Sequence, residues 1–176
     1  MKISALLSRA ILSAAVLAAS IASATPLTWT LQGVTYEDGA TASGSFIIES
    51  TTGNMLSWDI TTTAGLLSGF HYDLSDSSLF ARDFFGSPNS YTIVRNSPFA
   101  EPYINMTFVS ALTAPGTVNF TTAQNNSGSW ECINCDRIRY LTAGAVTTNP
   151  VPEPAPLALF GIALAALLAG RKLRQG

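Results

Sequence analysis

The sequence predicts an all-β protein whose body is a single β-sandwich-like domain of about nine short strands. Three observations predict this fold. From residue 25 to residue 148 the chain is rich in Thr, Ser, Gly and aromatic residues and lacks apolar patterns with the period of a helix. Short runs that alternate apolar and polar residues recur there between turn signals. A body of this length is also long enough to bury one hydrophobic core.

The first predicted strand begins at Leu27, and alternate residues up to Leu31 share one face. Gly33 then shifts the alternation to Val34 and Tyr36. An extra residue in a strand has this effect, so we predict a β-bulge at Gly33.

Two turn signals define the next elements. The dipeptide Asp38-Gly39 predicts a hairpin turn, and Gly53-Asn54 predicts a second turn before a strand with Leu56, Trp58 and Ile60 inward. Further strands are predicted at 70–74, 90–95, 103–110, 116–121, 127–132 and 138–146.

The N-terminal segment "MKISALLSRAILSAAVLAASIASATP" has the three parts of a secretory signal peptide. Lys2 and Arg9 supply the positive region, and residues 11–21 form an apolar stretch too short for an ordinary membrane span. Ala22 and Ala24 place small side chains at the −3 and −1 positions of a cleavage site. We predict that signal peptidase cleaves after Ala24; the alternative is an uncleaved N-terminal anchor.

The C-terminal segment has a second hydrophobic stretch, predicted as a transmembrane helix over 156–170. Alternating prolines from position 150 to position 156 exclude helix and sheet and favour an extended chain before it. The basic tail, Arg171, Lys172 and Arg174, is expected to stay cytoplasmic by the positive-inside rule. The chain therefore divides into a signal peptide (1–24), the β body (25–148) and a C-terminal signal (149–176).

Val151, Pro152, Glu153 and Pro154, followed by an apolar helix and a basic end, resemble the PEP-CTERM protein-sorting domain, also named the ice-binding protein C-terminal domain. This resemblance implies an inner-membrane-anchored precursor that an exosortase cleaves near the motif. The product would reach the cell surface or the medium. Residues 28–62 resemble PEP-CTERM surface proteins of unassigned function. The alternative is a periplasmic domain held by an uncleaved C-terminal anchor.

The charge of the body argues against nucleic acid as a partner. Residues 25–150 contain four arginines, no lysine and ten acidic residues, which gives a net charge of −6. Phosphate binding needs clustered Lys and Arg side chains, and such a cluster is missing from this part of the sequence.

Cys132 and Cys135 are the two cysteines of the chain. An exported protein favours a disulfide between them, because the periplasm is oxidising. Redox chemistry, a metal site and free thiols are the alternatives. The lone His71 is expected at a surface or edge, since no Gly-x-Ser-x-Gly motif accompanies it. We predict no catalytic residue, no metal and no cofactor.

Two acidic pairs, Glu37/Asp38 and Asp73/Asp76, could serve a glycoside hydrolase or bind Ca²⁺. The favoured interpretation is that they are solvent-exposed acidic residues in loops. Core packing is the favoured explanation for most of the aromatic residues, but their number exceeds what a small core needs, and the alternative is a sugar-stacking face. The residues concerned are Tyr36, Phe70, Tyr72, Phe84, Phe85, Tyr91, Phe99 and Tyr103. We therefore expect a non-catalytic structural module or one associated with exopolysaccharide. A secreted glycan hydrolase that uses the loop carboxylates is the alternative.

Overall fold

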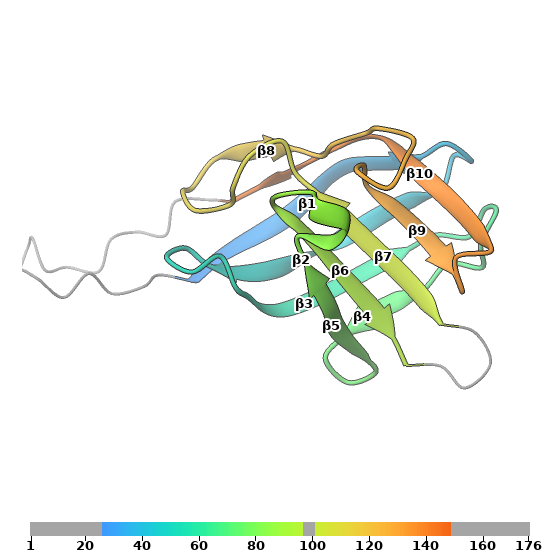
Figure 1. The fold of residues 1–176 in the computed structure, drawn as a ribbon, viewed down its shortest axis with the longest axis horizontal. Helices are drawn as coiled ribbons and strands as arrows, with labels where there is room; N and C mark the ends of the chain where they lie inside the picture. Colours follow the sequence, from blue (N-terminus) through green and yellow to red (C-terminus); the bar gives the residue numbers. More distant parts are fainter. Residues whose placement is uncertain (1–25, 97–100, 149–176) are drawn as a thin grey trace, which may run out of the picture.

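The computed structural model describes residues 26–96 and 101–148, which fold into ten strands and one short 3-10 helix (Figure 1). The elements are β1 (Pro26–Tyr36), β2 (Thr41–Glu49), β3 (Met55–Thr62), β4 (His71–Asp73), β5 (Ser77–Arg82), η1 (Phe84–Gly86), β6 (Ser90–Arg95), β7 (Pro102–Thr107), β8 (Thr117–Asn119), β9 (Trp130–Ile133) and β10 (Arg137–Thr147).

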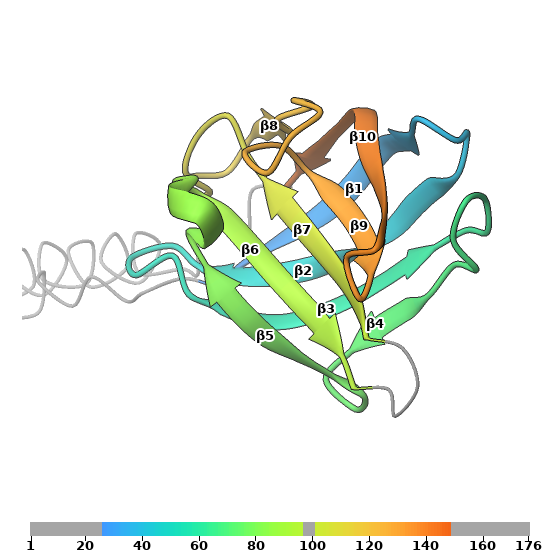
Figure 2. The ribbon, with the colours of Figure 1, turned by 45° about the vertical axis from the view of Figure 1, so that its right-hand side comes forward.

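The strands form one antiparallel sheet in the order β4-β3-β2-β1-β10-β9-β7-β6-β5, with β8 paired to β10 outside this path. The all-β prediction is confirmed, but the predicted two-sheet sandwich is wrong, because the sheet is continuous and nearly closed into a barrel (Figure 2). The reason is β10. Its first part, 137–140, pairs with β9, and its later part pairs with β1 and β8. This one long strand therefore joins the half of the sheet that contains β1 to the half that contains β9.

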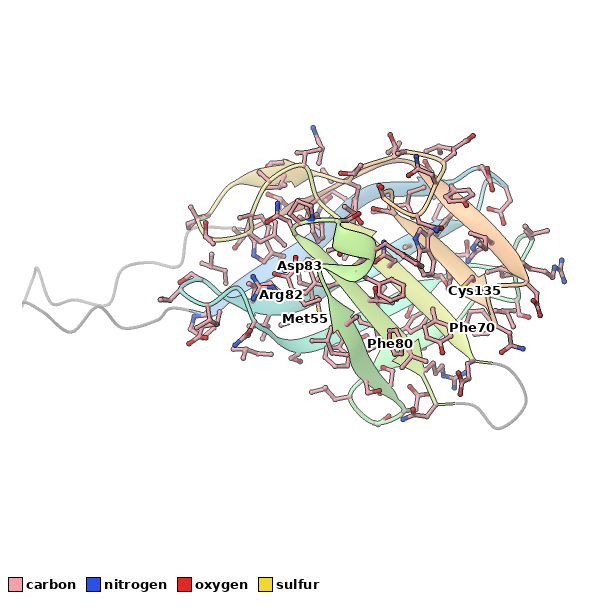
Figure 3. The ribbon with its side chains drawn as sticks, viewed as in Figure 1. Met55, Phe70, Phe80, Arg82, Asp83 and Cys135 are labelled. Atoms are coloured by element: carbon pink, nitrogen blue, oxygen red, sulfur yellow. A yellow bond between two sulfur atoms is a disulfide. The ribbon has the colours of Figure 1, made fainter. Side chains whose placement is uncertain are left out.

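Side-chain hydrogen bonds hold the two ends of the sheet together. Trp58 Nε1 of β3 donates to Ser77 Oγ of β5 at 2.8 Å. Further along, Tyr91 Oη donates to the carbonyl of Gly53 at 2.7 Å, and Arg82 Nη1 donates to the carbonyl of Thr52 at 2.7 Å. Figure 3 labels Arg82 near Met55 at this end of the molecule. The turn between β2 and β3 is therefore fastened to β5 and β6.

The predicted alternation of β1 is confirmed. Leu27, Leu31, Val34 and Tyr36 are buried, and the pairing with β2 shifts between Thr30 and Val34, around the predicted bulge. Gly33 adopts φ +58°, a conformation that glycine takes without strain.

The inward set predicted for the third strand is only partly right. Trp58 and Ile60 are buried, but Leu56 is 48% exposed and Met55 takes its place inside. A register shift after Ile47 pairs Ile48 with Met55, and this moves the alternation at the start of β3 by one residue.

The strands predicted further along the chain all occur. The one at 90–95 coincides with β6, and the others have shifted ends. The sequence prediction missed β5 entirely. Only the first residue of β5, Ser77, is buried, because β5 lies at the end of the sheet order, and so its residues lack the apolar alternation of a half-buried strand.

The core lies inside the rolled sheet. Its largest apolar side chains include Trp29, Phe46, Ile60, Tyr72 and Ile93, each less than 2% exposed. An ion pair is buried at one end of this core. Arg139 Nε of β10 donates to Glu131 Oε2 of β9 at 2.8 Å, and the guanidinium carbon lies 4.3 Å from the ring centroid of Tyr36.

The other oxygen of Glu131 is occupied as well. Tyr72 Oη donates to Glu131 Oε1 at 2.8 Å, and Thr62 Oγ1 donates to the same atom at 2.9 Å. Burial, followed by the charge of Glu131, raises the pKa of Tyr72 well above its usual value, so the phenol keeps the proton that it donates.

Part of the outer face of β6, β7 and β9 is buried as well. Ile104 faces the core, and its neighbours Tyr103 and Asn105 face outward, because alternate residues of a strand point to opposite faces. Asn105 is still only 1% exposed, since the loop at 122–128 covers it and the carbonyl of Gly128 accepts a hydrogen bond from Asn105 Nδ2.

The described residues contain no helix long and apolar enough to cross a membrane. The predicted signal peptide with Ala22 and Ala24, the sorting motif, the helix at 156–170 and the basic tail lie outside the described residues.

Candidate functional site

Four aromatic side chains gather on the outer face of the β5–β6–β7 layer, away from the core. The ring centroid of Phe80 lies 5.5 Å from that of Phe84 and 5.5 Å from that of Tyr103, both edge to face. Phe84 in turn lies 4.2 Å from Phe85. Phe80 is 52% exposed and Phe85 is 61% exposed. Clustered, exposed apolar side chains of this kind mark interaction sites.

A bulge in β5 presents Phe80. Leu79 pairs with Ile93 and Ala81 pairs with Thr92, so Phe80 is an extra residue without a partner on β6. β-bulges re-aim a side chain, and here the result is an aromatic ring at the surface of the outer face.

The turn between β5 and β6 presents the rings of Phe84 and Phe85. Phe85 has φ +53°, as has Asp83, and a bulky residue rarely adopts this conformation. The turn is held in place from inside: Asn89 N donates to Asp83 Oδ1 at 3.0 Å, and Phe84 N donates to Ser90 Oγ at 2.9 Å. Strained residues that the surroundings fix in this way concentrate at binding sites.

A cavity of about 500 Å³ opens beside the four rings, within the size range of small-molecule sites. Figure 3 labels Phe80 on β5 and Cys135 at the end of β9, which both line it. The full lining consists of Phe80, Phe84, Phe85, Glu101, Tyr103, Asn126, Trp130, Asn134, Cys135 and Ile138.

Two polar side chains at the cavity lack partners among the described residues. The indole N–H of Trp130 is buried and has no acceptor there. The Asn126 side-chain amide is exposed and makes no hydrogen bond with the described part of the chain. The exposed Asn126 amide beside the aromatic rings is available to a polar ligand with apolar faces, whereas the buried Trp130 N–H is not.

Glu101 is the one charged residue that the described part of the chain contributes to the cavity lining. Tyr103 Oη donates to Glu101 Oε2 at 2.7 Å, and this hydrogen bond raises the pKa of Tyr103. Glu101 N also donates to Asn134 Oδ1 at 2.9 Å. The carboxylate is therefore oriented before any ligand arrives.

Cys132 and Cys135 are joined by a disulfide across the turn between β9 and β10. The turn places Asn134 and Cys135 on the cavity, both with positive φ. Asn134 N donates to the carbonyl of Glu101 at 3.0 Å, so the disulfide-closed turn also supports the Glu101 side of the site.

The structure divides the aromatic residues singled out from the sequence. Phe84, Phe85 and Tyr103 line the cavity, and Phe99 lies outside the described residues. Tyr36, Tyr72 and Tyr91 are buried in the core, and Phe70 packs against it, so these four form no surface for stacking.

The acidic pairs have structural partners. Asp38 Oδ2 accepts hydrogen bonds from Leu66 N at 2.6 Å and from Arg139 Nη1 at 3.2 Å. Burial alone would raise the pKa of Asp38, but these hydrogen bonds outweigh it and lower the pKa. Asp76 Oδ2 accepts from Arg95 Nε at 2.6 Å.

Asp73 lies beside His71 at the surface. Asp73 Oδ1 accepts hydrogen bonds from the hydroxyl and the N–H of Ser75, which lower the pKa of Asp73. His71 Nε2 lies 2.8 Å from Asp59 Oδ1, and this hydrogen bond raises the pKa of His71. None of these residues lines the aromatic cavity. Over 26–96 and 101–148, no cluster of His, Cys, Asp and Glu suits a metal ion.

Sequence reasoning missed Phe80, Trp130, Asn126 and Asn134 at this site. The local composition "LFARDFFGS" (79–87), three phenylalanines in an otherwise polar turn region, was a signal for Phe80. The two asparagines carried no signal, because only the folded chain brings their loops to the same cavity.

Comparison with protein families identifies the C-terminus. Residues 150–175 match the model of the PEP-CTERM protein-sorting motif. The motif implies an exported protein, made as a membrane-anchored precursor and processed by an exosortase on its way to the cell surface. No curated protein and no solved structure matched the chain.

Proposed function

We propose that the β body is a non-catalytic glycan-binding module, displayed at the cell surface or released after sorting, with the aromatic cavity as its binding site. The observation that carries this proposal is the cluster of rings Phe80, Phe84, Phe85 and Tyr103 beside an open cavity. The C–H faces of a sugar ring pack on exposed aromatic rings, and its hydroxyl groups need nearby polar partners such as Asn126.

The carboxylates support binding without turnover. Glycoside hydrolysis by its usual route needs two carboxyl groups that flank the scissile bond. Glu101 is the only acidic residue that lines the cavity among the described residues. Asp73 and Asp76, the candidates for a hydrolase, are engaged by Ser75 and Arg95 away from the rings. The exopolysaccharide of the producing cell is the natural candidate ligand for a protein sorted to that surface.

Affinity electrophoresis of the full-length chain tests the proposal, in a detergent that has no sugar headgroup. The gel contains polysaccharide purified from the producing cells, and retardation is compared with a gel that lacks it. Phe80→Ala should migrate almost without retardation. Leu74→Ala, which shortens an exposed apolar side chain outside the cavity, should behave as the wild type.

A parallel assay for new reducing ends separates binding from hydrolysis. We expect retardation without release of reducing ends. Release that stops in Asp73→Asn or Asp76→Asn would instead favour the hydrolase. Absence of retardation by the polysaccharide of the producing cells would contradict the proposed function.

A further inference from the structure

A second cavity lies next to the aromatic one. Its volume is about 330 Å³, and it is formed by the turn at 85–89, the C-terminal end of β7 with the two residues after it, and the loop that follows β8. Phe85 lines both cavities. Asn126 lines the first cavity and the adjacent Ser127 lines the second, so the same loop borders both.

Phe85 stands at the junction of the two cavities. Its side chain is 61% exposed, and its backbone is fixed at φ +53° in a turn whose N–H groups and side chains hydrogen-bond to one another. A hydrophobic ring held outward in an uncommon conformation, with a cavity on each side, is suited to contact a ligand that passes across it.

The two cavities differ in their linings. The first is mainly aromatic, whereas the second has small polar groups, among them Asn89, Thr121 and Ser127. The side chains of these three residues make no hydrogen bond with other described residues. The second cavity therefore offers free hydrogen-bonding groups where the first offers stacking surfaces.

The charge of the combined surface selects among glycans. Among the described residues, no Lys or Arg lines either cavity, and the single charged residue is Glu101 in the first. A uronic acid would meet this carboxylate with no cation to balance it, and like charges at short range are unfavourable. A neutral sugar carries no such penalty.

We infer that the two cavities are subsites for one linear, uncharged oligosaccharide, which crosses Phe85 and occupies both. This inference rests on the proposed glycan-binding function and adds the length and charge of the ligand. Affinity should rise with chain length until both cavities are filled, and a negatively charged chain should bind more weakly.

Isothermal titration of the full-length chain, in a detergent without a sugar headgroup, tests this with defined probes. The probes are the disaccharide and the hexasaccharide of β-1,4-linked glucose, of β-1,4-linked mannose and of α-1,4-linked galacturonic acid. For at least one neutral series we expect the hexasaccharide to bind about tenfold more tightly than the disaccharide, and the galacturonate hexasaccharide to bind more weakly than either neutral hexasaccharide.

Two variants assign the gain to the second cavity. Ser127→Met fills it with an apolar side chain that has no ring, and should reduce hexasaccharide affinity to the disaccharide level while leaving the disaccharide unchanged. Val109→Ala, at an exposed residue of the same lining, should weaken only the hexasaccharide, by a smaller factor. Leu74→Met, an exposed residue in neither cavity, is the matched control.

The outcomes separate the inference from the proposed function. Equal affinity for the two lengths, or a normal hexasaccharide affinity in Ser127→Met, would overturn the second subsite and leave a single-cavity glycan module. Tighter binding of the galacturonate would overturn the charge argument. Absence of heat with every probe would overturn both the inference and the function on which it rests.

Discussion

The guanidinium of Arg139 and the carboxylate of Glu131 form an ion pair, and neither side chain is exposed to solvent. They are directly opposite each other on the neighbouring strands β10 and β9. Both groups make further hydrogen bonds. Arg139 also donates to Asp38 and to the carbonyl of Thr63. Glu131 also accepts from Tyr72 and Thr62.

Removing one member of this pair should destabilise the fold strongly. Arg139→Met leaves a buried carboxylate without its counter-ion, and we expect a loss of about 3–5 kcal/mol in the free energy of unfolding. Glu131→Leu should cost a similar amount. The double variant should cost clearly less than the sum of the two, because neither charge then remains unpaired. Urea unfolding followed by tryptophan fluorescence gives all three values, and strict additivity would show that the two charges are not coupled.

Asp38→Asn should reduce stability at neutral pH but not in acid. Asp38 has a lowered pKa in the folded protein, so its stabilising effect is present above the unfolded pKa of about 3.9 and is lost as the pH falls through the folded value. We expect the variant to lose about 1–3 kcal/mol at pH 7, since it replaces hydrogen bonds to a charged group. Unfolding curves of both proteins should converge toward pH 3, and a constant difference from pH 7 to pH 3 would refute this assignment.

Gly128→Ala should disturb both stability and the candidate site. A Cβ at this position would lie 1.8 Å from the carbonyl oxygen of Ala123, and the backbone must move to accommodate it. The carbonyl of Gly128 accepts hydrogen bonds from the side chains of Asn105 and Thr107 on β7, so the loop is tied to the outer face of that strand. We expect a loss of about 1–3 kcal/mol, as for overpacked sites, together with weaker glycan binding. Ser127→Ala in the same loop is the control for stability, and it should unfold as the wild type does.

The disulfide between Cys132 and Cys135 should contribute modestly to stability, because it closes a very short loop. The loop-entropy relation gives about 2 kcal/mol. Reductant should lower the unfolding midpoint of the wild type accordingly and leave Cys132→Ala/Cys135→Ala unaffected. Since the turn supports Glu101 through Asn134, reduction should also weaken glycan binding. Unfolding that does not respond to reductant would show that the bond does not contribute.

Processing at both ends is open to direct measurement by intact mass. From the producing cells we expect a species that begins at Thr25 and ends near Pro152–Pro154, found in the surface or medium fraction. Replacement of Glu153 by Ala in the PEP-CTERM match should lead to accumulation of a membrane-bound form that retains Arg174. A wild-type protein that keeps Arg174 in the membrane fraction would identify the C-terminus as a permanent anchor.

Alternation and turn chemistry were sufficient to predict much of the fold. The face of β1, its bulge at Gly33 and the hairpin turn at Asp38 follow from local sequence, because period-two burial and positive φ leave direct signatures. Closure of the sheet has no such signature in the local sequence. It depends on β10 pairing with three strands and on contacts such as Trp58 with Ser77, which join distant parts of the chain.

The same distinction applies to the site. An excess of aromatic residues indicated a stacking surface, but core and surface rings looked alike in the sequence: Tyr72 and Tyr103 both lie in short predicted strands. Only the register shows that one faces the core and the other the cavity. Likewise, nothing in the local sequence marks Glu131 and Arg139 as partners, since a buried ion pair has no local pattern.

The place where the folded body meets the sorting signal has a mechanical consequence. β10 ends at Thr147, and Thr148 N donates to the carbonyl of Gly116, immediately before the PEP-CTERM match begins at residue 150. If the body is held through this end while a polysaccharide pulls on the cavity, the load runs along β10. Hydrogen bonds of an antiparallel sheet lie perpendicular to the strands, so such a load shears the bonds to β1, β8 and β9 together. Bonds loaded in parallel share the force, and the attachment point is therefore expected to resist traction better than an edge strand such as β5, which would peel bond by bond.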